Sequence, residues 1–217
     1  MRKLPGLLGA ALLLSSMGQA QIGQDTAQPA TCLFDHFAYG EVKLKNGAVE
    51  STRLNYDTEN QTILFRQGGQ NLVLTGLENI DTVYLQDKRF IPAEDKFYEV
   101  GTSTQIALLI SYSYKTHPLT ATTDHDGTAQ KDNNQVSNNV SEAYTNRRFQ
   151  GHYSVTFTPH YWLRIGHSFY KANTEKEVIK VFPRKEAAIR EFIAANKIAF
   201  GRQDDMARLI LFCNEQP

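Results

Sequence analysis

The sequence predicts an α+β fold, an antiparallel β meander of about seven to nine strands followed by two C-terminal helices. Between residues 39 and 116, apolar residues alternate with polar ones, and turn-forming pairs interrupt the alternation. After residue 182 the apolar residues recur at helical spacing instead. We therefore expect a single domain in which a C-terminal helical pair, residues 172–217, packs on a β-rich region, residues 39–171.

Two residue pairs are typical of tight hairpin turns in the first half of the chain. Asn46-Gly47 suits the two positive φ angles of a type I′ turn, and Gly68-Gly69 suits a mirror-image turn of the same kind. Pro92 marks an edge strand or a break. The strands expected around these turns span residues 41–45, 49–56, 62–67, 70–75, 82–86 and 96–100.

Two longer segments carry the strongest strand pattern. Residues 106–115 are apolar on one face and mixed on the other, so they should form a central or near-central strand. Residues 149–165 repeat the pattern, but Pro159 cannot donate a hydrogen bond and is expected to split them into a bent edge strand or a hairpin. The segment between them, residues 117–148, is polar and is expected to be a mobile insertion.

Two apolar stripes predict the helical pair. Pro183 has the fixed φ angle of a first helical position, and Asp204-Asp205 favours the start of a second helix. The first stripe, in a helix over 183–196, comprises Ile189, Phe192, Ile193 and Asn196, and the second comprises Met206, Leu209, Ile210 and Cys213.

The chain begins with the pattern of a secretory signal peptide, residues 1–20. Two basic residues precede an apolar run over 4–14, and small residues lead to Ala20, where cleavage is expected. The run is shorter than the about 20 residues that a transmembrane helix needs. We therefore expect an N-terminal extension, residues 21–38, and an exported chain without a transmembrane segment, in the periplasm, at the outer-membrane periphery or secreted.

Export places both cysteines where disulfides persist. Cys32 and Cys213 either form a structural disulfide or remain two buried thiols, since Cys213 lies on an apolar helical stripe. In the chain-entropy model the disulfide would stabilise the fold by about 5 kcal/mol at most.

Composition and motifs exclude several functions. The chain of 217 residues has 23 basic and 23 acidic residues, so it lacks the basic field of a nucleic-acid-binding protein. A mean hydropathy of −0.42 excludes a multi-span membrane protein. The sequence has no G-x-S-x-G, H-E-x-x-H or glycine-rich phosphate-binding motif. We therefore assign no catalytic, metal-binding or cofactor-binding residue, and whether the protein is an enzyme stays open, with a non-catalytic role favoured.

One candidate ligand surface lies within residues 149–165. His152, His160, Trp162 and Arg164 share a strand face, on which Trp162 and Arg164 would form a stacking surface for a sugar or peptide. The alternative is a polar outward face on which Trp162 only covers the core. His152 and His160 are roughly 26 Å apart along an extended strand, too far to share a metal ion unless a hairpin forms.

Five segments carry recognisable turn and packing motifs: Tyr39-Gly-Glu-Val-Lys-Leu-Lys-Asn-Gly, Leu54-Asn-Tyr-Asp, Phe90-Ile-Pro, Val181-Phe-Pro-Arg-Lys, and Ile193-Ala-Ala-Asn-Lys-Ile-Ala-Phe leading into the final helix. With these motifs the chain resembles a group of exported β-rich proteins of unassigned function from Gram-negative bacteria. The resemblance spans most of the mature chain and transfers no catalytic residue. The polar segment 117–148 stands where that group often carries a Tyr-Gly-rich segment.

We therefore expect a non-catalytic binding or structural module of the cell envelope, which holds an unknown envelope protein or ligand through a sheet edge or the polar insertion. One alternative is a periplasmic hydrolase with its site around residues 152–164. Another is an interaction subunit whose segment 117–148 becomes ordered when a partner binds.

Overall fold

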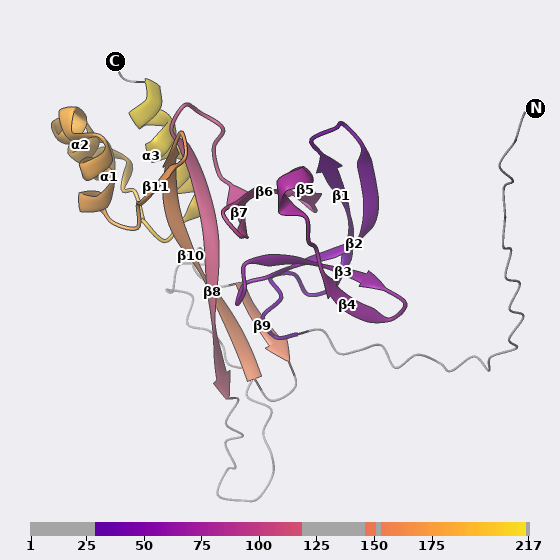
Figure 1. The fold of residues 1–217 in the computed structure, drawn as a ribbon. Helices are drawn as coiled ribbons and strands as arrows, with labels where there is room; N and C mark the ends of the chain where they lie inside the picture. The colour runs from indigo at the N-terminus through magenta and orange to yellow at the C-terminus, as the bar shows by residue number, and fades with distance from the viewer. Residues whose placement is uncertain (1–28, 119–145, 151–152, 216–217) are drawn as a thin grey trace, which may run out of the picture.

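A computed structural model of the chain describes residues 29–118, 146–150 and 153–215, in which eleven strands form one antiparallel sheet with three α-helices at the C-terminal end (Figure 1). The predicted α+β class is confirmed, with more strands than expected. The strands are β1 (Ala38–Leu44), β2 (Val49–Asp57), β3 (Thr62–Gln67), β4 (Gln70–Val73), β5 (Ile80–Leu85), β6 (Lys88–Ala93), β7 (Lys96–Val100), β8 (Ala107–Pro118), β9 (Asn146–Gln150), β10 (Tyr153–Ile165) and β11 (Ser168–Lys171). The helices are α1 (Glu175–Val181), α2 (Glu186–Asn196) and α3 (Gln203–Glu215), with short 3₁₀ helices η1 (Leu77–Asn79) and η2 (Pro183–Lys185).

The antiparallel meander is confirmed, and it is built in two parts, each a meander of its own. Its strand order is β11-β10-β8-β7-β6-β5-β1-β2-β3-β4, with β9 paired to β10, so the two meanders meet where β5 pairs with β1. The sheet also curls, so that β7 lies close to the start of β3. The Phe97 N–H of β7 donates to the Gln61 carbonyl, next to β3, at 2.8 Å. The Tyr56 hydroxyl of β2 donates to the Phe97 carbonyl at 3.0 Å. These bonds fix the β1–β4 half against β7.

The two predicted tight turns differ in type. Gly68 and Gly69 both have positive φ angles, 57° and 77°, as a two-residue mirror-image turn requires. At the first hairpin only Gly47 has a positive φ, 91°, and its N–H donates to the Leu44 carbonyl at 2.9 Å. The type I′ prediction at Asn46-Gly47 is therefore wrong, because Asn46 keeps a negative φ and the glycine alone takes the left-handed conformation.

Strand β10 runs unbroken through Pro159, so the predicted split at this residue is wrong. The Tyr161 N–H points away from β8 and donates to Asn173 Oδ1 at 2.8 Å. Pro159 has the same strand parity, and it lies between the residues of β10 that pair with β9 and those that pair with β11. The proline therefore removes no bond from the ladder with β8. Strand β8 lies between β7 and β10, which confirms its predicted central place.

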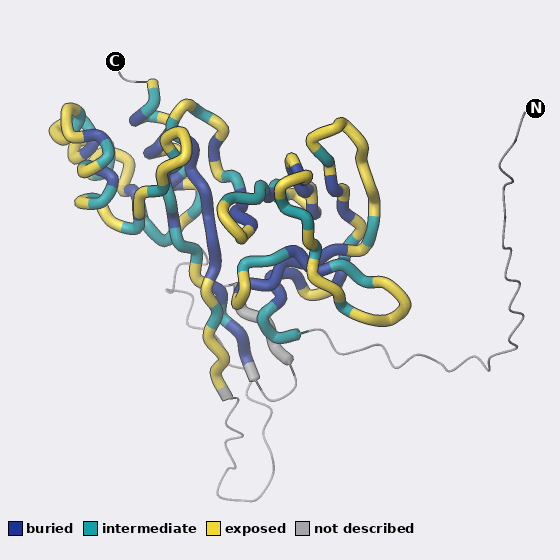
Figure 2. The backbone as a smooth tube through the Cα atoms, in the orientation of Figure 1, coloured by how far each residue is buried: buried dark blue, intermediate teal, exposed yellow. Residues whose placement is uncertain are grey.

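The apolar stripe predicted for the last helix is confirmed. Met206, Leu209, Ile210 and Cys213 of α3 are all fully buried and belong to the same core cluster as Leu108 of β8. Figure 2 shows this burial on α3 and along the first half of β8, in contrast with the exposed hairpin ends. The helix predicted over 183–196 is present as η2 followed by α2.

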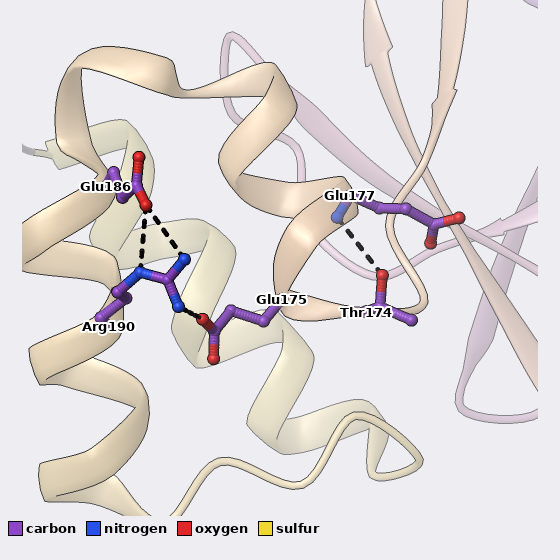
Figure 3. Close-up of polar contacts among 5 residues, drawn as sticks. All are labelled: Thr174, Glu175, Glu177, Glu186 and Arg190. Carbon is purple, nitrogen blue, oxygen red and sulfur yellow. Dashed lines mark hydrogen bonds and ion pairs between the residues drawn. The ribbon is translucent and has the colours of Figure 1, made fainter.

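Helix α1 was not predicted, although the sequence carries its start signal. Thr174 Oγ1 accepts a hydrogen bond from the Glu177 N–H at 3.3 Å, and Glu177 Oε2 accepts one from the Asn173 N–H at 2.7 Å. This is close to the T-x-x-E capping box. Arg190 of α2 then joins the helices by donating to Glu186 and to Glu175 of α1 (Figure 3).

Replacing Thr174 with Ala should lower the free energy of unfolding by about 1 kcal/mol, because the first turn of α1 loses its side-chain acceptor. Thr75→Ala, in the exposed loop before η1, is the matched control and should change stability by less than about 0.5 kcal/mol. Urea denaturation followed by circular dichroism measures both. Equal effects of the two substitutions would contradict the role of Thr174 as a cap.

The described part of the predicted N-terminal extension packs on β2. The Leu33 N–H donates to the Tyr56 carbonyl at 2.8 Å, while the side chain of Asn55 accepts from the Phe34 N–H at 3.1 Å and donates to the Phe34 carbonyl at 3.0 Å. Residues 1–28 and 119–145, which include the predicted signal peptide and most of the polar insertion, lie outside the described residues. Among the described helices, none is long and apolar enough to cross a membrane.

No disulfide joins Cys32 to Cys213 in the structure. Cys32 is buried in a small cluster with Phe37 and Leu64, whereas Cys213 of α3 belongs to the main core. Burial raises the pKa of Cys213 to about 11, although Lys185 acts in the opposite direction. The two sulfurs thus lie in separate clusters, as in the alternative of two buried thiols.

Candidate functional site

Three of the four residues of the predicted ligand surface share one face of β10. His160, Trp162 and Arg164 occupy alternate positions of this strand, while His152 lies outside the described residues. Their face is opposite to that of Tyr161 and Leu163, which belong to the core cluster with the helices. We call it the Trp162 surface; it comprises Tyr98, Leu109, Ser111, Ser113, His160, Trp162, Arg164, Phe169 and Lys171 of β7, β8, β10 and β11.

Trp162 is held in a fixed position on this surface. Its indole N–H donates to Ser111 Oγ at 3.0 Å, and the Tyr98 ring meets it edge-on, with ring centres 6.4 Å apart. Phe169 extends the cluster, 5.5 Å from Tyr98, and fully buried Leu109 lies on the same face. Trp162 itself is only half-buried. It therefore helps to cover an apolar residue, as one interpretation predicted, and still offers part of its ring to a ligand.

A serine and a histidine form a close polar pair beside Trp162. His160 Nε2 and Ser113 Oγ are 2.8 Å apart, and the Ser113 side chain is exposed. Burial of the imidazole, and secondarily the charge of Lys171, lower the pKa of His160 below its usual 6.5. The ring is therefore neutral at pH 7 and can accept the serine proton.

Two cations flank the indole. Lys171 of β11 is paired directly opposite Trp162, and Arg164 occupies the next position on the same face of β10, opposite Phe169. Side chains that are directly opposite in an antiparallel pair have Cβ atoms about 5 Å apart. Both positive charges therefore lie within reach of a molecule that contacts Trp162.

Replacing Lys171 with Gln should raise the pKa of His160 toward its ordinary value, because a positive charge that disfavours the imidazolium is removed. The rise should be partial, since burial is the larger cause and remains. A pH titration of the His160 ring protons by NMR measures it, with the resonance assigned from His160→Gln. A midpoint that does not move, or that falls, would contradict the placement of Lys171 near the ring.

A second polar cluster, not predicted, lies on the core-facing side of the sheet. Lys88 Nζ is 2.8 Å from Glu99 Oε1, Tyr112 donates its hydroxyl to Glu99, and Gln203 Nε2 donates to the Tyr112 oxygen at 2.6 Å. Lys88 closes the ring with a contact of 3.4 Å to Gln203 Oε1. Burial, and then the charge of Glu99, raise the pKa of Tyr112, so its hydroxyl stays protonated.

This closed ring is best explained as a structural connection. Gln203 is the first residue of α3, and the other three members belong to β6, β7 and β8, so the ring fastens the helix to the sheet. Each member has a partner within the ring, which leaves no polar group aimed at a ligand. One sequence feature indicates this cluster: the charged residue Glu99 lies two positions after Phe97, and therefore on the face of its strand that points to the core.

The edge of the sheet at β4 is a weaker candidate for binding. Among the described strands it pairs with β3 alone; it carries no charged residue, and Leu72 and Val73 are exposed. Nothing in the described structure indicates which chain would pair with it. The Trp162 surface is therefore the better-defined site.

Within the part of the chain that the structure describes, no three His, Cys, Asp or Glu side chains are grouped so as to hold a metal ion. Comparison with protein-family models, with curated proteins and with solved structures finds no match to this chain. Function must therefore be argued from the geometry of the site.

Proposed function

We propose that this protein is an exported, non-catalytic binding module of the cell envelope, and that it holds its ligand on the Trp162 surface. Support for export comes from the leader pattern of residues 1–20 and from the resemblance to exported proteins of Gram-negative bacteria. The observation that carries the binding role is the half-buried Trp162, locked by Ser111 and Tyr98 and flanked by two cations.

An immobilised, half-exposed indole suits binding because it presents a large amphipathic surface without losing side-chain freedom when the ligand arrives. His160, Ser113 and the flanking cations add hydrogen-bonding groups within the same face. A surface with one apolar platform and several polar groups around it is typical of sites that bind a polar ligand.

A binding screen tests the proposal. The mature chain, residues 21–217, is applied to immobilised oligosaccharides and envelope peptides, beside the variants Trp162→Ala and Tyr84→Ala. Tyr84 is an exposed aromatic residue on β5, outside the Trp162 surface, and serves as the control. We expect Trp162→Ala to weaken binding by at least about tenfold, or about 1.4 kcal/mol, and Tyr84→Ala to leave it unchanged. Binding that survives Trp162→Ala at full strength would overturn the proposal.

The Ser113–His160 pair favours a second candidate, a periplasmic hydrolase. Ser113 Oγ would attack an ester carbonyl carbon while its proton passes to His160 Nε2, and the bond from that carbon to the leaving-group oxygen would break as this oxygen takes the proton. Water would then attack the acyl-serine, release the acid and return the proton to Ser113. No carboxylate among the described residues has a hydrogen bond to the His160 ring, so the third member of a triad is not shown. Ester turnover that disappears in both His160→Ala and Ser113→Ala, with folding intact, would establish this alternative.

A further inference from the structure

We infer that the ligand of the Trp162 surface is an acidic saccharide, whose sugar ring stacks on Trp162 and whose carboxylate binds Arg164 and Lys171. The inference deepens the proposed function and depends on it. It is carried by the charge, the aromatic geometry and the distribution of apolar residues on this face of the sheet.

The charge of this face differs from that of the whole chain, which has equal numbers of acidic and basic residues. Among the described side chains, the positions of β6, β7, β8, β10 and β11 on this face include no Asp or Glu. Its Lys and Arg residues are Arg89, Lys96, Lys115, Arg164 and Lys171.

These charges are not neutralised by neighbours within the described structure. None of the described ion pairs includes Lys171 or Arg164, and Lys171 is exposed. Glu94, in the turn between β6 and β7, contributes after burial to raising the pKa of Tyr98. That carboxylate therefore acts at the β7 side of the surface, whereas Arg164 and Lys171 lie at the β11 side, where an anionic group would bind.

The geometry fits a sugar that carries a carboxylate. The fixed indole provides a flat apolar platform for the C–H face of a sugar ring, and Ser113 with His160 provides partners for its hydroxyl groups. The planar guanidinium of Arg164 matches a carboxylate with two parallel hydrogen bonds. Lys171, directly opposite Trp162, supplies a second positive charge at the edge of the platform.

The distribution of apolar residues disfavours a lipid surface. None of the large exposed apolar side chains of the described chain belongs to the Trp162 surface. Tyr84 lies opposite Arg89 on this face of the sheet, but on β5, which three strands separate from β10. The two nearest to Trp162 in sequence, Ile165 and Tyr170, have the opposite strand parity. A membrane-binding face would expose such residues beside its cations. A peptide of Asp and Glu residues would use the same cations but has no ring to stack on Trp162.

Calorimetric titration of the mature chain with trigalacturonate and with its methyl ester tests the inference. The ester keeps the sugar rings and removes the carboxylate charges. We expect the acid to bind at least about tenfold more tightly than the ester. The affinity for the acid should fall as the NaCl concentration rises from about 50 to about 300 mM. Arg164→Gln and Lys171→Gln should each reduce affinity by about tenfold, whereas Arg53→Gln, a matched exposed cation on β2, should not.

The outcomes separate the inference from the proposed function. Equal binding of acid and ester, lost in Trp162→Ala, would overturn the acidic class and keep the binding module. If neither sugar binds but another member of the screen binds in a Trp162-dependent way, the acidic class is likewise overturned and the binding module is kept. Binding of poly-glutamate or phosphatidylglycerol vesicles in place of trigalacturonate would overturn the saccharide. If Trp162→Ala leaves the binding of every ligand unchanged, both the acidic class and the proposed binding function are overturned.

Discussion

Replacing Lys88 with Met is expected to lower the free energy of unfolding by about 4 kcal/mol, because it leaves the Glu99 carboxylate buried without its cation. The side chains of Lys88 and Glu99 are only 17% and 9% exposed and are 2.8 Å apart. A pair this deep is weakly screened by solvent, so removing one partner has a much larger effect than at the surface. Chemical denaturation of the wild type and the variant measures the difference.

A double substitution provides the control. Adding Glu99→Gln to Lys88→Met removes the unpaired charge while keeping a side chain of the same size, so at least half of the lost stability should return. Arg190→Met, which disrupts a half-exposed pair on α2, should lower stability by less than about 1 kcal/mol. If Lys88→Met has an effect as small as Arg190→Met, the buried ring does not fasten α3 to the sheet.

Replacing Gly40 with Ala should lower the free energy of unfolding by about 3 kcal/mol. A Cβ at this position would lie 2.6 Å from the Tyr84 carbonyl oxygen and 2.9 Å from a methyl group of Leu54. The Tyr84 carbonyl oxygen belongs to the backbone and cannot rotate away, so β1 and β5 would have to separate where the two meanders meet. Thermal denaturation of the variant measures the effect.

Gly101→Ala is the matched control for Gly40→Ala. Its Cβ would meet only side-chain atoms of Leu108 and Ile110, the nearest at 3.0 Å, and these can shift by a few tenths of an ångström. We expect less than about 1 kcal/mol of destabilisation. Similar losses in the two variants would show that the β1–β5 contact is not the tight junction that the structure describes.

The fold class followed from local periodicity, and each error has an identifiable physical cause. The α3 stripe and the central place of β8 depend on residue spacing alone, so both were predicted. The split at Pro159 was wrong because a missing N–H matters only where the ladder needs it, and that depends on which side of β10 has a partner. Pairing of β5 with β1 is a contact between distant segments, which periodicity does not encode.

Strand parity predicted which residues form the candidate site, but not which residues they contact. Parity alone places His160, Trp162 and Arg164 on one face. The contacts of Trp162 with Ser111 and Tyr98 depend on the register between β8 and β10, which are separated in the sequence by residues 119–152. The ring of Lys88, Glu99, Tyr112 and Gln203 likewise joins four elements and could not be assembled from spacing.

The chain contains a single tryptophan, so its indole N–H gives one resonance in a ¹H–¹⁵N spectrum, and that resonance reports directly on the proposed site. A titration with the tightest ligand from the binding screen should shift the Trp162 indole signal together with amides of β7, β8, β10 and β11. Shifts confined to β1–β4 or to the helices, with the indole signal unmoved at saturation, would contradict the account.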